Sequence, residues 1–64
     1  MNRSEEFYLA SECDFLESCL KLLNIEYKRN DNAISEKTGM KVFKVDFEAT
    51  TEQYAAIVKM FSVR

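Results

Sequence analysis

The sequence predicts an α+β fold: a small two-layer β-α-β-β-α arrangement, with two helices on one face of a three-stranded antiparallel sheet. Three observations predict it. Residues 43–48 alternate apolar and charged side chains, residues 50–61 combine a helix cap with an apolar stripe, and residues 7–24 divide into a strand-like and a helix-like part. The 64 residues suit a single domain, residues 1–64, and no more.

The first part of the chain, residues 7–24, has two interpretations. In the first, residues 7–10 form a short strand, and Ser11 caps a helix with Glu12 and Asp14 in its first turn, where the helix dipole favours acidic side chains. In the second, apolar residues at alternating spacings of four and three form one long helix from about residue 5: Leu9, Cys13, Leu16, Leu20 and Leu23. We favour the first interpretation, because Phe-Tyr-Leu has better strand than helix propensity. Asn24 ends the helix in both.

A β-hairpin is predicted next. Its first strand covers residues 25–29 and resumes at residues 33–35, after the polar trio at residues 30–32, which suits a turn or a bulge. Gly39, the only glycine, lies in the connecting loop, where a residue with positive φ is needed. The second strand, residues 43–48, has a period of two, which directs Phe43, Val45 and Phe47 toward the core.

The last element is a helix that begins near Thr50. Thr50 and Gln53 have the spacing of a capping box, in which each side chain bonds a backbone N–H of the other residue. Four apolar residues then recur at helical spacing and form one stripe: Tyr54, Ile57, Val58 and Phe61. This stripe is predicted to be core rather than a cofactor site.

The resulting order is a truncated ferredoxin-like arrangement, which lacks the final strand of that fold. If residues 7–10 are helical, the alternative is an α-β-β-α fold with a two-stranded sheet, which is marginal alone. Both versions leave one sheet face uncovered and strand edges open. Residues 7–10 carry no charge, and we expect this edge to pair with another chain, since unprotected edges do so.

The sequence lacks the residues that common reaction mechanisms need. It contains no histidine, the usual acid or base near neutral pH, and one glycine cannot build a phosphate-binding loop. Cys13 and Cys19 are six residues apart on the predicted helix, so their side chains diverge, and we expect buried free thiols rather than a disulfide or a zinc site. The sequence therefore predicts a non-enzymatic protein with no catalytic residues, no metal and no cofactor.

The charge pattern bears on possible partners. The net charge of −2 is small for a nucleic-acid-binding protein, which relies on dense positive charge. Val42 and Lys44 also occupy the outward positions of the third strand, where RNA-binding sheets carry stacking aromatic residues. A weak nucleic-acid-binding patch remains the alternative, and its candidate residues are Lys28, Arg29, Lys41 and Lys44.

By elimination, the expected function is that of a protein-binding module. It would be a small regulator or inhibitor of the phage or mobile-element type that docks on a larger protein. The residues expected to meet a basic partner surface are Glu5, Glu6, Tyr8, Glu12, Asp14 and Glu17. A homodimer through an open strand edge or the open sheet face is a further alternative. Because the sequence has no apolar run of about 20 residues and no apolar leader, we expect a cytoplasmic protein with no membrane partner.

Overall fold

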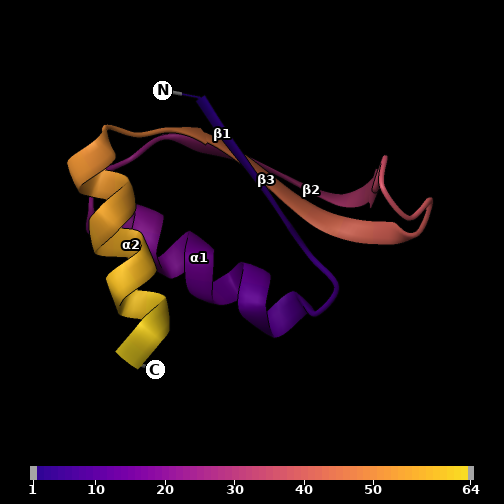
Figure 1. The fold of residues 1–64 in the computed structure, drawn as a ribbon, viewed down its shortest axis with the longest axis horizontal. Helices are drawn as coiled ribbons and strands as arrows, with labels where there is room; N and C mark the ends of the chain where they lie inside the picture. Colours follow the sequence, from indigo (N-terminus) through magenta and orange to yellow (C-terminus); the bar gives the residue numbers. More distant parts are fainter. Residues whose placement is uncertain (1, 64) are drawn as a thin grey trace.

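The computed structural model describes residues 2–63, whose elements follow the order β-α-β-β-α (Figure 1). They are β1 (Asn2–Phe7), α1 (Ala10–Leu22), β2 (Tyr27–Ile34), β3 (Lys41–Glu48) and α2 (Thr51–Val63). The predicted class, a small α+β fold with three antiparallel strands and two helices, is therefore confirmed. The alternative with a two-stranded sheet is wrong, because β1 pairs with β3 along its whole length.

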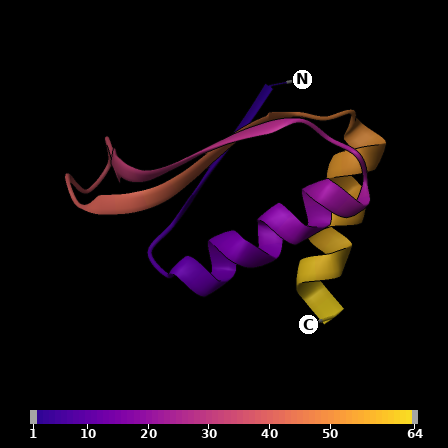
Figure 2. The ribbon, with the colours of Figure 1, turned by 180° about the vertical axis from the view of Figure 1, so that it is seen from behind.

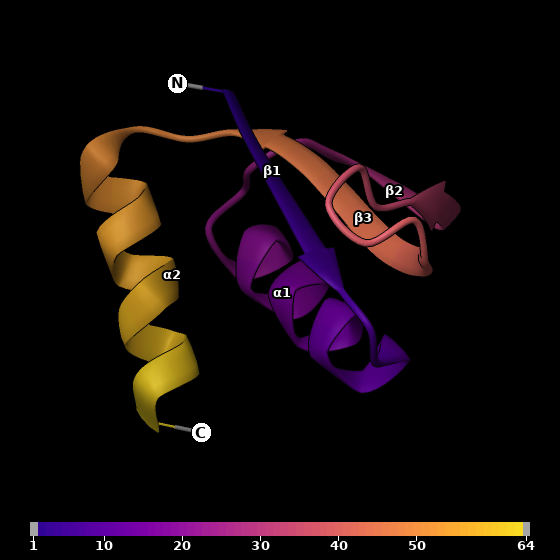
Figure 3. The same ribbon diagram turned by 45° about the vertical axis from the view of Figure 1, so that its right-hand side comes forward.

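The sheet is open and has the strand order β1-β3-β2, with both pairings antiparallel. β3 is the central strand, and β1 and β2 form the two edges. Both helices lie on the same side of this sheet, and no helix lies on the other face, which we call the open face (Figures 1 and 2). β1 crosses β3 obliquely (Figure 3), as the twist between adjacent strands requires.

The first strand lies earlier in the chain than predicted. It covers Asn2–Phe7 rather than residues 7–10, and α1 starts at Ala10, with Leu9 in the cap position and no side-chain cap. The predicted cap, Ser11, instead lies inside the helix, and only Glu12 of the two predicted acids is in the first turn. The reason is that β1 is mostly polar, so its strand character comes from pairing with β3 rather than from local propensity.

The hairpin is longer and more continuous than predicted. β2 runs through the polar trio at residues 30–32, which forms a bulge, with the register shifting between Asn30 and Ala33. The Asn32 N–H donates a hydrogen bond to Asn30 Oδ1 at 2.9 Å, which supports the bulge locally. Gly39, with φ of 72°, and Asn24, with φ of 57°, both adopt the left-handed conformation that their predicted positions require.

The core lies between the helices and the covered face of the sheet. α1 contributes its buried residues Cys13, Leu16, Cys19 and Leu20. From the central strand, Val45 and Phe47 are buried against them and Phe43 is half-buried, so the predicted inward side of β3 is confirmed. Both cysteines are free thiols in this core, as predicted.

The predicted capping box starts α2. The Gln53 N–H donates to Thr50 Oγ1 at 3.1 Å, and the Thr50 N–H donates to Gln53 Oε1 at 2.9 Å. The apolar stripe that follows is only partly core: Ile57 is buried, whereas Val58 is 48% exposed and the two aromatic residues are half-buried. α2 therefore keeps apolar surface beside the sheet.

Candidate functional site

The open face of the sheet is polar in part, and its charges alternate in sign. The strand pairings place two rows across it, Glu6 with Lys44 and Asn30, and Ser4 with Asp46 and Lys28. Side chains directly opposite on neighbouring strands lie about 5 Å apart, so each lysine has an acidic neighbour. These two rows therefore form a mixed, polar surface with no single charge sign. Nearer the hairpin loop the same face is apolar, because Val42, expected to be an exposed outward residue, is buried there and paired with Ala33.

The four basic candidates for nucleic-acid binding do not form one surface. Lys28 and Lys44 lie on the open face beside the acidic residues just described. Arg29 lies on the covered side and contacts α1, and Lys41 is exposed at the start of β3. Binding of a nucleic-acid backbone needs positive charges along one track. The geometry does not favour this alternative.

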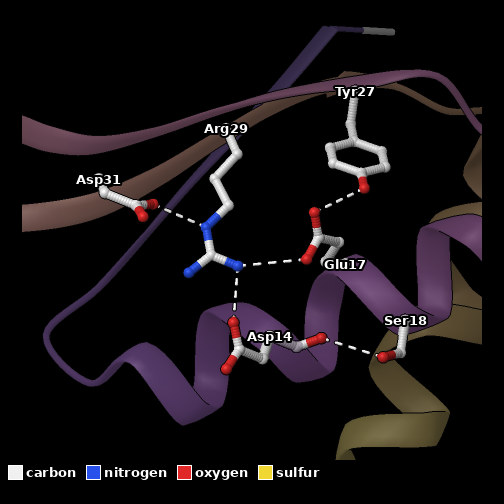
Figure 4. A network of polar contacts seen from close by, with 6 residues as sticks. All are labelled: Asp14, Glu17, Ser18, Tyr27, Arg29 and Asp31. Atoms are coloured by element: carbon white, nitrogen blue, oxygen red, sulfur yellow. Dashed lines mark hydrogen bonds and ion pairs between the residues drawn. The ribbon is translucent and has the colours of Figure 1, made fainter.

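Arg29 joins β2 to α1 through a network of ion pairs (Figure 4). Its Nη1 atom lies 2.6 Å from Asp14 Oδ1 and 3.2 Å from Glu17 Oε1, and its Nε atom lies 2.7 Å from Asp31 Oδ1. The Tyr27 hydroxyl donates a hydrogen bond of 2.6 Å to the second carboxylate oxygen, Oε2, of Glu17. The network fixes the position of α1 against the edge strand β2.

These contacts shift the pKa values of two members. Hydrogen bonds to Asp31 and Asp14 raise the pKa of Arg29, so the guanidinium stays charged at any accessible pH. The hydrogen bond to Glu17 raises the pKa of Tyr27, and burial raises it further. Tyr27 is therefore a protonated donor to Glu17 throughout the neutral range.

Cys13 does not have the character of a nucleophile. Its side chain is fully buried, and this burial raises the pKa of the thiol above its ordinary value of 9.0, although Arg29 acts in the opposite direction. Nucleophilic cysteines need a lowered pKa and access to substrate, because the thiolate is the reactive form. The environment of Cys13 is that of a core thiol.

Two of the acids predicted to meet a partner are engaged within the domain. Asp14 and Glu17 both bind Arg29, and Glu17 also accepts the hydrogen bond from Tyr27. Carboxylates that are already paired offer less to a basic partner than free ones do. Their role in the fold is therefore visible, whereas their role in binding stays a prediction.

The other predicted partner-binding residues are spread over different surfaces. Glu5 points to the covered side of β1 and Glu6 to the open face, because successive strand residues alternate. Tyr8 is exposed in the turn after β1, and its hydroxyl donates to Thr38 Oγ1 at 3.3 Å, in the hairpin loop. Glu12 is half-buried in the first turn of α1. The structure does not gather these residues into one patch.

The strongest candidate for a binding surface is the outer edge of β1 with the groove beside it. Within residues 2–63, β1 pairs with β3 on one side and has no strand on the other. α2 runs alongside in the same direction. The guanidinium carbon of Arg3 lies 3.8 Å from the centre of the Tyr54 ring, and Phe7 stacks on Phe61 with ring centroids 6.1 Å apart.

The groove between β1 and α2 has a volume of about 330 Å³ and is mainly apolar. The residues that shape it include Glu5, Phe7, Tyr54, Ile57, Val58 and Phe61. The two sheet edges differ beside it. Both edges carry charged side chains, but β2 also carries a bulge, a feature that protects an edge from pairing, whereas the pairing of β1 with β3 is regular.

Arg3 contributes an unsatisfied polar atom to this surface. Its Nε atom is buried and has no hydrogen-bond partner among the described residues. Leaving a buried donor unpaired costs about 1–3 kcal/mol, and a carboxylate is the acceptor that a guanidinium binds most strongly. None of the ion pairs of Arg29 involves Glu5, and Arg3 forms no ion pair with another residue between 2 and 63.

The sequence prediction placed the open edge wrongly and missed Arg3. The edge is not the uncharged segment at residues 7–10, because Tyr8 and Leu9 lie in a turn and Ala10 begins α1. The signal for the true strand is the alternation of half-buried Arg3, Glu5 and Phe7 with exposed polar residues. Two of those three inward residues are charged, and a search for apolar alternation overlooks them.

Comparisons with known proteins add no relative from which a role could be transferred. In the described part of the chain, neither helix has the length and apolar character that crossing a bilayer requires. Residues 2–63 also hold no group of three or more histidine, cysteine, aspartate or glutamate side chains placed to bind a metal ion. A scan against protein-family models and searches of curated proteins and solved structures found no match.

Proposed function

We propose that this chain is a protein-binding module whose contact surface is the outer edge of β1 together with the groove between β1 and α2. We call this the β1–α2 surface. One observation carries the proposal: a regular, unpaired strand edge lies beside an apolar groove and an unsatisfied Arg3 Nε. An added strand gains backbone hydrogen bonds from such an edge, and the neighbouring groove selects its side chains.

The chemistry of the surface specifies the bound segment. It is extended, and its alternate residues face the groove, where Tyr54 and Val58 accept apolar contacts. On the same side of the segment, an acidic residue would pair with Arg3, and a basic residue two positions away would pair with Glu5. A regulator or inhibitor that acts by occupying a partner's surface needs no more than this, since binding alone is its activity.

A selection from a displayed library of random twelve-residue peptides tests the proposal. We expect enriched peptides to combine apolar residues with an acidic and a basic residue two positions apart, and to slow amide hydrogen exchange along β1. Val58→Lys should weaken their binding at least tenfold, because the added charge occupies the groove. Val58 is 48% exposed and lysine has good helix propensity, so the variant should fold.

The matched control is Val63→Lys, the same change on the same helix at a residue that is 80% exposed and outside the groove. It should leave peptide binding unchanged. If no peptide binds the wild-type chain, or if bound peptides tolerate Val58→Lys as well as Val63→Lys, the β1–α2 surface is not the contact surface.

A further inference from the structure

We infer that the β1–α2 surface binds β1 of a second copy of this chain, antiparallel and centred on Ser4, so that two copies form a twofold-symmetric dimer. The inference rests on the proposed function, because it names the partner of the same surface. In this pairing Ser4 faces Ser4, Arg3 faces Glu5 and Asn2 faces Glu6. Two three-stranded sheets would join as one continuous six-stranded sheet.

The covered face of the sheet restricts the possible registers. Residues directly opposite in an antiparallel pair point to the same face. Arg3, Glu5 and Phe7 all point to the helix side, as their contacts with α2 and the groove show. Both α2 helices therefore lie on the same face of the joined sheet only if the inward residues of one β1 are opposite the inward residues of the other. This occurs when the twofold axis passes through a residue, and not when it passes between two residues.

Three registers near the middle of β1 meet this condition, with the axis at Arg3, Ser4 or Glu5, and the charges distinguish them. Centring on Arg3 places two guanidinium groups opposite each other, and centring on Glu5 does the same with two carboxylates. Centring on Ser4 gives two Arg3–Glu5 pairs and sets two small hydroxyl residues on the axis. Opposite charges directly across a strand pair stabilise it, and like charges destabilise it. β1 is therefore self-complementary in one register.

The register centred on Ser4 also gives Arg3 an ion pair and covers apolar surface that is exposed in the single chain. The carboxylate of Glu5 from a second copy approaches the guanidinium of Arg3, which forms no ion pair with residues 2–63 of its own chain. The two α2 helices would lie over the paired β1 strands, which covers the exposed side of Val58. The only edges left are the two β2 strands, and both carry the bulge between Asn30 and Ala33 that protects an edge.

Charge variants and sedimentation equilibrium test the register. The wild-type chain should show a concentration-dependent monomer–dimer equilibrium. Arg3→Glu and Glu5→Arg should each weaken it about tenfold or more, because two attractive pairs per dimer become repulsive. An equimolar mixture of the two variants should recover the dimer as a heterodimer, because each facing pair again joins an acid to a base. Lys21→Glu, a charge change of the same size at an exposed residue in the last turn of α1, should leave association unchanged.

Several outcomes would overturn the inference. A wild-type chain that is monomeric at every concentration removes the dimer, and if library peptides still depend on Val58, the proposed function stands without it. A dimer that tolerates both charge variants, or that the mixture fails to restore, pairs through another surface. Circular dichroism checks that each variant folds. If Arg3→Glu does not fold, Glu5→Arg is compared with Lys21→Glu. A register centred on Ser4 predicts loss of the dimer for Glu5→Arg and no change for Lys21→Glu.

Discussion

Arg29 forms two ion pairs with α1 that differ in length and in exposure. Its removal therefore tests whether burial or distance decides how much an ion pair stabilises the fold. Its bond to Asp14 is the shorter, 2.6 Å against 3.2 Å for Glu17, but Asp14 is 64% exposed and Glu17 27%. Solvent screens an exposed pair strongly, so we expect the Glu17 pair to stabilise the fold more. Arg29→Met should lower the free energy of unfolding by about 1–2 kcal/mol in total.

Double-mutant cycles measured by urea unfolding check this expectation. One cycle combines Arg29→Met with Glu17→Gln, and the other combines it with Asp14→Asn. The coupling energy should be larger in the first cycle, on the order of 1 kcal/mol, and smaller in the second. A larger coupling to Asp14 would mean that distance outweighs exposure in this network.

The two raised pKa values predict that the domain loses stability in alkaline solution. In the folded state Cys13 and Tyr27 keep protons that the unfolded chain releases, since their pKa values lie above the ordinary 9.0 and 10.0. The stabilisation is fully present below these unfolded values and is lost as the pH rises through the folded ones. The urea midpoint should therefore be flat near pH 7 and fall above about pH 9.

Two single variants test how much of the stability loss in alkaline solution comes from Cys13 and how much from Tyr27. Cys13→Ala should flatten the part that begins near pH 9, and Tyr27→Phe the part above about pH 10, whatever each variant does to stability at neutral pH. The titrations are run with a reducing agent to prevent thiol oxidation. Slopes unchanged in both variants would show that other groups drive the alkaline loss.

Among the secondary-structure elements, α2 offers the clearest test of a local signal. Thr50→Ala removes the hydroxyl that accepts the Gln53 N–H bond, and such a loss costs about 1 kcal/mol. Thr51→Ala is the control, because Thr51 is exposed, lies inside the helix and is not the cap. Urea unfolding should show a loss for the first variant and less than about 0.5 kcal/mol for the second. Equal losses would mean that the capping box does not hold the start of α2.

The elements differ in how far the sequence predicts them, and the difference follows the range of the interactions involved. α2 and β3 are set by neighbours a few residues away, through the capping box and strict alternation, so both were predicted. β1 is set by its pairing with β3, about forty residues along the chain, and its polar sequence gives little local indication. The Arg29 network was not foreseen either, because Asp14 and Glu17 are 15 and 12 residues away.

In the molecule as a whole, the candidate site results from a sheet that stops at three strands while α2 extends past its edge. The sequence predicted an open edge, since the order of elements lacks a fourth strand. It did not predict which face of α2 stays exposed, because Tyr54, Ile57, Val58 and Phe61 form one continuous stripe. The packing of α2 along β1 decides which of them are core and which shape the groove.

Ile57 and Val58 are adjacent in α2, but we expect Ile57 to stabilise the core and Val58 to contact a partner. Ile57 is buried, and truncating a buried isoleucine to alanine costs about 2–5 kcal/mol, against a total of about 3–10 kcal/mol for a chain of this length. Ile57→Ala should leave a large unfolded fraction at 37 °C. Val58→Ala removes mainly exposed surface and should keep the domain folded.

Thermal unfolding at several protein concentrations distinguishes the two roles. A dimer raises the melting temperature as concentration increases, because association stabilises only the folded state. Val58→Ala should keep a cooperative transition but reduce its dependence on concentration, whereas Ile57→Ala should lower the melting temperature at every concentration. If both variants lose the same stability, the whole stripe acts as core, and the surface beside β1 is too well packed to receive a second strand.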